Sequence, residues 1–157
     1  MVKTAVFLYH SPINTLYYGD FMLTVNDLMT DVPHTITIDT PLRNVIGLMK
    51  TGGYHHLPVL EMGKLVGIIT DRDVRLVMNS PMVMHERAQE EEMLANVTAE
   101  SCMTADPITV TSETAVSQAA SLLRKYKFGA LPVVDDGLLV GIITVTDFLD
   151  YFIEAGS

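Results

Sequence analysis

Apolar residues occur along this chain in two arrangements, short continuous runs and sets at helical spacing. The runs at residues 65–69 and 138–143 have the length of buried strands, and a Thr-x-x-Asp sequence typical of a helix start follows each of them. A helical set follows residue 41, and it consists of Leu42, Val45, Ile46 and Met49. The pattern therefore predicts a chain in which strands and helices alternate.

The first half of the chain predicts the order strand, helix, strand, strand, helix. Thr40 is the expected N-cap of the first helix, with Pro41 at its first position, and Gly52 and Gly53 are expected to end it. A turn at residues 61–63 joins the two later strands. The strands are predicted at residues 35–38, 56–60 and 64–70, and the closing helix at residues 71–78.

A second copy of this pattern lies 74 residues further along the chain. Residues 25–77 align without a gap to residues 99–151, with 18 identities in 53 positions. About 3 identities would arise by chance from ordinary residue usage, so the chain contains a duplication. In the second copy, the inner face of the first helix is expected at Val116, Ala119, Ala120 and Leu123. The hairpin turn of this copy is expected at residues 135–137.

The duplication divides the chain into segments. We expect an N-terminal extension at residues 1–24, a first repeat at 25–78, an acidic helical connector at 79–96 and a second repeat at 97–153. In the connector, Ser80-Pro81 is an N-cap and first-position pair, and the acidic residues after it are more typical of a solvated helix than of an interaction tail.

Composition narrows the class of protein. The 157 residues are 48% hydrophobic and 18% charged, which suits a globular fold, and the net charge of −9 without a basic run argues against nucleic-acid binding. The apolar piece at residues 5–9 is too short to cross a membrane or to form a signal peptide, so we expect neither a targeting segment nor membrane insertion. The single cysteine, Cys102, suggests a packing role and a cytoplasmic location.

The ordered pieces of each copy together resemble a tandem pair of cystathionine-β-synthase (CBS) domains. They are Leu-Met-Thr at residue 28, Leu-Pro-Val at residues 57 and 131, a glycine turn, and GIITxxD at residues 67 and 141. The resemblance covers about residues 25–152. It implies an α/β (α+β) fold of two β-α-β-β-α repeats related by pseudo-twofold symmetry, in a stand-alone protein. It also implies two clefts, which in many members bind AMP, ADP, ATP or S-adenosylmethionine as regulatory ligands.

The same resemblance implies which residues contact the ligand. The ribose-binding Gly-x-x-Thr-x-x-Asp pattern of the family is complete in both copies, and the adenine of each site is held by the start of the opposite repeat. The expected residues are Gly67, Thr70 and Asp73 with Thr104 and Ile108 in one site, and Gly141, Thr144 and Asp147 with Thr30 and His34 in the other.

Elementary chemistry permits two interpretations of the Thr-x-x-Asp sequence. A carboxylate can accept hydrogen bonds from both ribose hydroxyls, and a hydroxyl with helix-start N–H groups can meet a phosphate. The same residues are close to a capping box, in which they only complete a helix N-terminus. The same residues can cap the helix at one time and contact a ligand at another, so both interpretations stay open.

The two sites are expected to differ in charge. His55 and His56 precede the first Leu-Pro-Val, where the second copy has Gly129 and Ala130, and Arg72 stands where the second copy has Thr146. We therefore expect the Asp73 site to bind phosphorylated ligands more tightly, with AMP binding strengthened as the histidines gain protons between pH 8 and 6. The alternative is that both imidazoles stay neutral, one of them packed in the core.

The combined indications favour a regulator over an enzyme. No nucleophile, metal or phosphate-loop motif occurs, and His55 and His56 point to opposite faces of a strand, so no metal site and no required cofactor are expected. The hypothesis is a sensor of adenosine-containing ligands that modulates an unknown partner protein. The alternatives are a ligand-free protein interaction module, an S-adenosylmethionine-binding regulator, or an accessory part of an acetoin-utilisation or transport system.

We also expect a homodimer that forms through the closing helices, because these helices carry more apolar residues than one small core need bury. The alternative is that all of these side chains pack within the pair of repeats. The residues concerned are Val74, Val77, Met78, Phe148, Tyr151 and Phe152.

Overall fold

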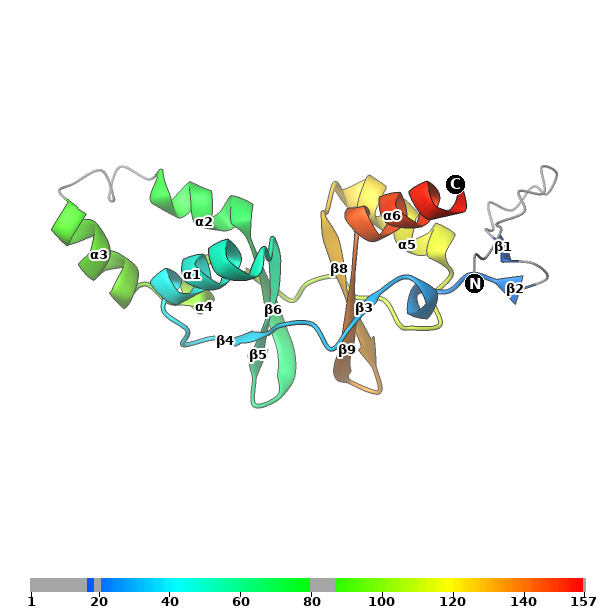
Figure 1. The fold of residues 1–157 in the computed structure, drawn as a ribbon. Helices are drawn as coiled ribbons and strands as arrows, with labels where there is room; N and C mark the ends of the chain where they lie inside the picture. Colours follow the sequence, from blue (N-terminus) through cyan, green and yellow to red (C-terminus); the bar gives the residue numbers. More distant parts are fainter. Residues whose placement is uncertain (1–16, 19–20, 80–86, 157) are drawn as a thin grey trace. The chain divides into compact units, whose positions relative to one another are not determined.

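The computed structural model describes residues 17–18, 21–79 and 87–156, so the expected cap at Ser80-Pro81 lies outside the described residues. The chain folds into two compact units (Figure 1). The central unit is residues 33–107. The terminal unit combines the chain up to Val32 with the chain from Ile108 onward.

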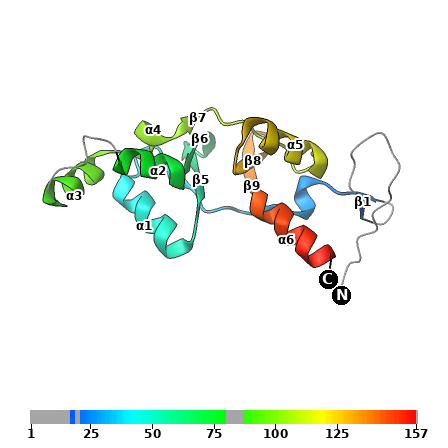
Figure 2. The same cartoon turned by 90° about the horizontal axis from the view of Figure 1, so that it is seen from above.

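The central unit is built on a four-stranded sheet in the order β4-β5-β6-β7. Strand β4 is parallel to β5, and the β5–β6 and β6–β7 pairs are antiparallel. Helices α1 and α2 lie on one side of the β5–β6 hairpin in both views (Figures 1 and 2). The elements of this unit are β4 (Ile36–Thr37), α1 (Leu42–Gly52), β5 (His56–Glu61), β6 (Lys64–Thr70), α2 (Asp71–Met78), α3 (Arg87–Asn96), α4 (Ala99–Cys102) and β7 (Thr104–Ala105).

The terminal unit repeats this plan. Its sheet has the order β3-β9-β8, and a parallel bridge between Val110 and Val133 stands at the position of the β4–β5 pair. Helices α5 and α6 pack on the β8–β9 hairpin (Figure 2). The elements are β1 (Tyr17–Tyr18), β2 (Phe21–Met22), a 3-10 helix η1 (Val25–Asp27), β3 (Thr30–Asp31), α5 (Val116–Tyr126), β8 (Ala130–Asp135), β9 (Leu138–Thr144) and α6 (Val145–Ala155).

Each unit contains the start of one repeat and the body of the other. The start of the second repeat, α4 and β7, lies in the central unit, where β7 pairs with β6. The start of the first repeat, η1 and β3, lies in the terminal unit, where β3 pairs with β9. The exchange brings the first residues of each repeat beside the Gly-x-x-Thr-x-x-Asp sequence of the other.

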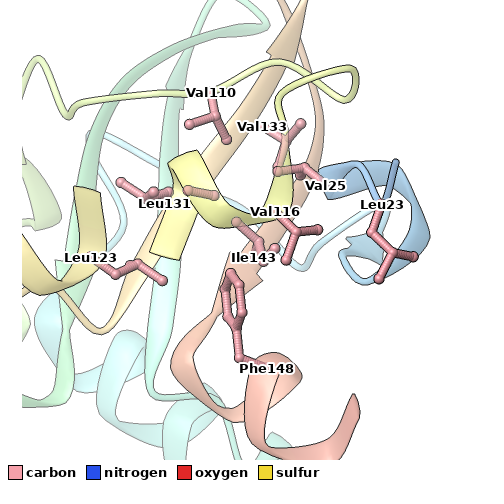
Figure 3. Packing of buried hydrophobic residues seen from close by; sticks show 10 residues of the cluster. Leu23, Val25, Val110, Val116, Leu123, Leu131, Val133, Ile143 and Phe148 are labelled. Atoms are coloured by element: carbon pink, nitrogen blue, oxygen red, sulfur yellow. The ribbon is translucent and has the colours of Figure 1, made fainter. Parts of the chain in front are cut away.

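Each unit has its own apolar core. In the terminal unit, Phe148 projects from α6 toward Ile143 of β9 and Val116 of α5 (Figure 3). The central core contains Leu57, Val59 and Ile69 from the hairpin, all of them fully buried, with Leu42, Val45 and Val74 from the helices. Leu57 and Val59 face the same side because alternate residues of a strand do so, and Ile69 of β6 joins them because it pairs with Leu57.

Type I′-like turns connect both hairpins. Met62-Gly63 and Asp136-Gly137 have positive φ at both positions, the conformation that matches the twist of two-residue hairpins. The strand and helix bounds expected for β6 and α2 are confirmed to the residue. The first helix was predicted one residue too early: Pro41 is its N-cap and Leu42 its first residue.

Two other expectations need correction. The strand predicted at residues 35–38 is shorter, Ile36–Thr37. It ends there because Thr40 turns its hydroxyl back to accept from the Thr37 N–H at 3.1 Å, which also takes Thr40 away from the helix cap. The connector is not wholly solvated, since Leu94 of α3 is buried in the central core. Within the described part of the chain, no helix is long and apolar enough to span a membrane.

Candidate functional site

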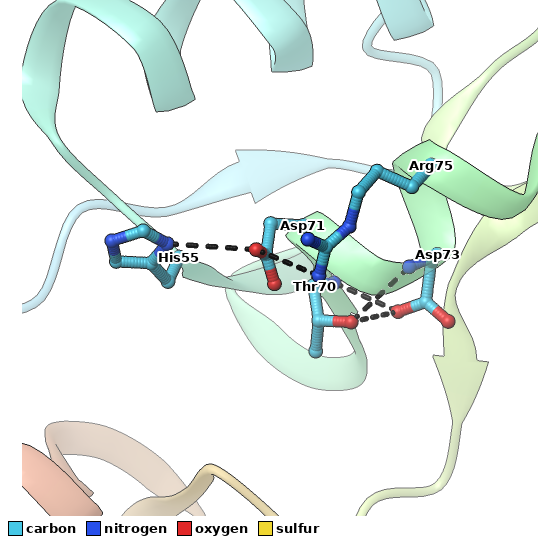
Figure 4. A network of polar contacts seen from close by, with 5 residues as sticks. All are labelled: His55, Thr70, Asp71, Asp73 and Arg75. Carbon is cyan, nitrogen blue, oxygen red and sulfur yellow. Dashed lines mark hydrogen bonds and ion pairs between the residues drawn. The ribbon is translucent and has the colours of Figure 1, made fainter. Parts of the chain in front are cut away.

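The Thr70 to Asp73 segment forms a complete capping box at the start of α2. The Asp73 carboxylate accepts through Oδ2 from the Thr70 N–H at 2.8 Å and from the Thr70 hydroxyl at 2.7 Å, and the Asp73 N–H donates to that hydroxyl at 3.3 Å (Figure 4). The hydroxyl proton therefore points at Asp73. A phosphate could receive a hydrogen bond from Thr70 only by displacing that contact.

The second copy has the same geometry at the start of α6. Asp147 Oδ2 accepts from the Thr144 N–H at 2.6 Å and from the Thr144 hydroxyl at 2.8 Å. In both copies the side chains of the Thr and the Asp are only partly buried. The amide at the first helical position is also engaged, since Val145 donates to the Gly129 carbonyl, as Asp71 donates to that of His55.

The capping box leaves binding capacity in each site. All carboxylate contacts of Asp73 and Asp147 use Oδ2, and among the described residues no hydrogen bond reaches either Oδ1. An ionised carboxylate has about four acceptor positions. The second helical amide, that of Arg72 or Thr146, has no intrahelical acceptor. Each helix start therefore offers one carboxylate oxygen and one N–H to a ligand while the cap stays intact.

A third Thr-x-x-Asp box shows that capping alone also explains such a sequence. Thr24 and Asp27 form a capping box at η1, with the Thr24 N–H 2.8 Å from Asp27 Oδ2. This sequence has no glycine three residues before the Thr, because Phe21 stands there. Sequence reasoning did not identify this box, although its spacing was visible. It provides an internal comparison for the two candidate sites.

Two of the expected adenine contacts lie in the same unit as their Asp. Thr104 pairs with Ile68 next to Gly67 in the central unit, and Thr30 pairs with Ile142 next to Gly141 in the terminal unit. Ile108 belongs to the terminal unit and His34 to the central unit, where it stacks on Tyr54 with 5.0 Å between ring centroids. The pairing of Ile108 with Asp73 and that of His34 with Asp147 stay predictions.

Charged side chains gather around the start of α2 (Figure 4). Arg75 forms an ion pair with Asp71 at 3.1 Å, and His55 Nδ1 lies 3.7 Å from the same Asp71 oxygen. Arg72 is exposed and has no ion-pair partner among the described residues. It is therefore a fixed, exposed positive charge on the first turn of α2. The second copy has Val145, Thr146 and Leu149 at the positions of Asp71, Arg72 and Arg75.

The two histidines differ in environment. His55 is exposed, whereas burial lowers the pKa of His56, with Asp71 opposing that shift to a smaller extent. His56 therefore stays neutral to lower pH than an ordinary histidine. This favours the neutral-imidazole alternative for His56.

The described residues were also compared with the requirements of a metal site and of a reactive thiol. Among the residues that the structure describes, no group of three or more His, Cys, Asp or Glu side chains could hold a metal ion. Burial, followed by the Asp73 charge, raises the pKa of Cys102, so its thiol is less ionised than a free one.

Comparison with known proteins agrees with this architecture. The family model named CBS domain matches the chain twice, at residues 25–80 and 99–154. A CBS domain-containing protein of Dictyostelium discoideum is 37% identical over 132 residues, which cover 83% of this chain and 91% of that protein. Some curated relatives are longer, and the chain spans less than half of their length.

Solved structures also resemble the chain. CBSX2 in complex with AMP shares 27% identity and a TM-score of 0.71, with 85% of this chain and 99% of that chain covered. The CBS domain pair of protein MJ0100, in complex with 5′-methylthioadenosine and S-adenosyl-L-methionine, shares 30% identity and a TM-score of 0.69, with 83% and 99% covered. The likeness extends over nearly the whole length of both neighbours.

Proposed function

The chain belongs to the CBS-domain family, and from this premise we propose that it is a cytoplasmic regulatory module that binds AMP, ADP or ATP and modulates a partner protein. Structural neighbours hold adenosine-containing molecules, AMP in one case and 5′-methylthioadenosine with S-adenosylmethionine in another, which supports this ligand class. The proposal assigns the chain no reaction of its own.

The observation that carries the proposal is the open Oδ1 of Asp73 and of Asp147. A carboxylate oxygen has about two acceptor positions, so Oδ1 can accept from both O–H groups of a vicinal diol, and its charge strengthens such bonds. Gly67 and Gly141 lie on the neighbouring strands, and Thr104 and Thr30 pair beside them. The ribose of an adenosine ligand would therefore meet the carboxylate, with its base toward the paired strand.

The decisive experiment is calorimetry of AMP, ADP, ATP and S-adenosylmethionine with the parent chain and with Asp73→Ala and Asp147→Ala. Loss of a hydrogen bond to a charged group costs about 1.5 to 3 kcal/mol, so affinity at the altered site should fall about 10- to 150-fold. Both variants also lose a capping box, which costs about 0.5 to 2 kcal/mol of stability.

Asp27→Ala is the matched control, because Asp27 closes the same capping box outside the Gly-x-x-Thr-x-x-Asp pattern. It should lose a cap of the same kind while keeping ligand affinity. If both site variants bind every ligand as the parent does, the ribose assignment is wrong. If the parent binds none of the four, the ligand-free interaction module is the better hypothesis.

The charge difference between the copies supports a division of ligands. Arg72 gives the Asp73 site a fixed positive charge, whereas the Asp147 site has Thr146 there and Gly129 and Ala130 in place of the histidines. The Asp73 site should prefer AMP over adenosine, and the Asp147 site should tolerate an uncharged tail. Arg72→Thr copies the second site, and it should reduce the AMP preference in an Asp147→Ala background. An unchanged AMP preference in that variant would refute the role of Arg72.

The proposed assembly is a homodimer formed through α6. Of the six apolar residues expected at the dimer interface, Val74 and Phe148 are buried within their own units. Val77, Met78 and Tyr151 pack against those cores. Val145 and Leu149, however, are 43% and 56% exposed where α2 carries the Asp71–Arg75 ion pair.

The double variant Val145→Asp with Leu149→Arg copies the charged surface of α2. It should fold with parental stability yet sediment as a monomer at tens of micromolar, because each copy would have to bury two charges at the interface. A parent chain that is monomeric at that concentration would contradict the homodimer.

A further inference from the structure

Gly67 and Gly141 are the first residues of the two Gly-x-x-Thr-x-x-Asp sequences, and neither needs glycine for its backbone. Positive φ among the described glycines occurs at Gly53, Gly63 and Gly137 only. Both Gly67 and Gly141 lie inside a strand, where any residue with a side chain could adopt the conformation. The requirement for glycine must therefore come from the space around it.

A methionine occupies that space in each unit. A Cβ on Gly67 would overlap Sδ of Met103 and lie 2.9 Å from its Cγ. A Cβ on Gly141 would lie 2.5 Å from Sδ of Met29 and 3.2 Å from its Cγ, and also 3.1 Å from the Thr30 carbonyl oxygen. The same arrangement occurs in both units, and in each of them the methionine and the glycine come from different repeats.

Each methionine directly precedes an expected ligand contact. Met103 is followed by Thr104 and Met29 by Thr30, and the strands that begin there, β7 and β3, contain only two residues each. So short a strand has few ladder hydrogen bonds to fix its position. At the end of β7 the Asp106 N–H donates to the Val66 carbonyl at 3.1 Å, and at the end of β3 the Val32 N–H donates to the Val140 carbonyl at 3.2 Å.

We propose that Met103 and Met29 are positioning residues for the two ligand sites: each places its thioether on the glycine of the neighbouring strand and thereby fixes the Thr that follows it. This inference rests on the proposed function for its effect on ligand affinity. The effect on strand position does not depend on any ligand. A flexible thioether fills a groove above a glycine well, since it is unbranched and adapts its rotamers.

The test is a pair of double-mutant cycles. Gly67→Ala places a methyl group against the methionine, so it should lower AMP affinity about tenfold in an Asp147→Ala background and weaken hydrogen-exchange protection of the Asp106 amide. Met103→Ala should weaken both as well. In the Met103→Ala protein, Gly67→Ala should change either readout less than about twofold, because the overlapping atoms are gone.

The second unit gives a matched comparison with a different expected result. There the added methyl group also approaches the Thr30 carbonyl, which is backbone and does not move with the side chain. Met29→Ala should therefore relieve only part of the effect of Gly141→Ala on the Val32 amide. Equal relief in the two units would contradict this geometry.

Additive effects of Gly67→Ala and Met103→Ala would overturn the proposal, because independent sites do not share a contact. So would a Gly67→Ala protein of lowered stability whose Asp106 amide and AMP affinity are unchanged, since that is the signature of core packing alone. If the parent chain binds no adenosine ligand, the proposed function fails, and the amide exchange still decides whether the methionines position the strands.

Discussion

Replacing Val32 with asparagine should stabilise the protein, although it removes an apolar side chain. Val32 has φ of +47°, in the left-handed region that β-branched residues almost never adopt. That conformation costs an ordinary L-residue about 1 to 2 kcal/mol, and asparagine adopts it more readily because its short polar side chain bonds locally. The position equivalent to Val32 in the second repeat is Asp106, which has the same φ of +47°.

The Val32→Asn substitution removes little stabilising interaction. The Val32 side chain is 87% exposed, so its apolar burial is worth less than about 0.5 kcal/mol. The Val32 N–H donates to the Val140 carbonyl, and asparagine keeps that backbone bond. The expected net gain is about 0.5 to 1.5 kcal/mol, and each kcal/mol raises the unfolding temperature of a protein of this size by about 2 to 4 °C.

Urea unfolding of the parent, Val32→Asn and the reciprocal Asp106→Val would measure the effect. Val32→Asn should raise the midpoint without changing the slope, and Asp106→Val should lower it by a similar free energy. The reciprocal variant controls for effects peculiar to one unit. A Val32→Asn midpoint at or below the parent's, together with an unchanged Asp106→Val midpoint, would show that the left-handed valine stores no strain.

Two further outcomes are expected. Burial lowers the pKa of His56, so near and below pH 6.5 this side chain binds fewer protons in the folded protein than in the unfolded chain. The free energy of unfolding should therefore decrease as the pH is lowered from about 7.5 to 5.5. Urea unfolding should show a smaller decrease in His56→Ala. Gly53→Ala should lower the free energy of unfolding by about 1 kcal/mol in the same assay. No atom lies within 4 Å of the added Cβ, so such a loss would come from the backbone φ of +69° and not from a steric clash.

The sequence predicted elements best where two local signals coincide. Strand β6 and helix α2 have the expected bounds because an apolar run ends at Thr70 and a cap begins there. The start of α1 was misplaced because Thr40 bonds back to Thr37, a choice between two local hydrogen bonds that composition does not decide. The burial of Leu94 depends on tertiary packing, which an acidic helix pattern conceals.

The sequence predicted the candidate sites as sets of residues, which stay predictions, and it did not predict their geometry. The repeated Thr-x-x-Asp left capping and ligand contact as alternatives, and the structure makes the cap explicit while leaving one carboxylate oxygen available. The methionine beside each glycine was visible in the alignment, since Met29 and Met103 are identical at equivalent positions. Its contact with the glycine was not, because that contact joins residues of different repeats.

The duplication separates what the backbone requires from what sets the chemistry of a site. Residues that are identical in the two copies stabilise local structure: Thr70 and Thr144 cap a helix, and Asp73 and Asp147 complete the cap. The positions around them have diverged in charge; Arg72, for example, corresponds to Thr146. Exposed substitutions of that kind usually change stability by less than about 0.5 kcal/mol, whereas loss of a cap costs about 1 kcal/mol. The proposed difference in ligand preference between the two copies therefore requires no change in the capping residues, because the charge differs at exposed positions around the two helix starts.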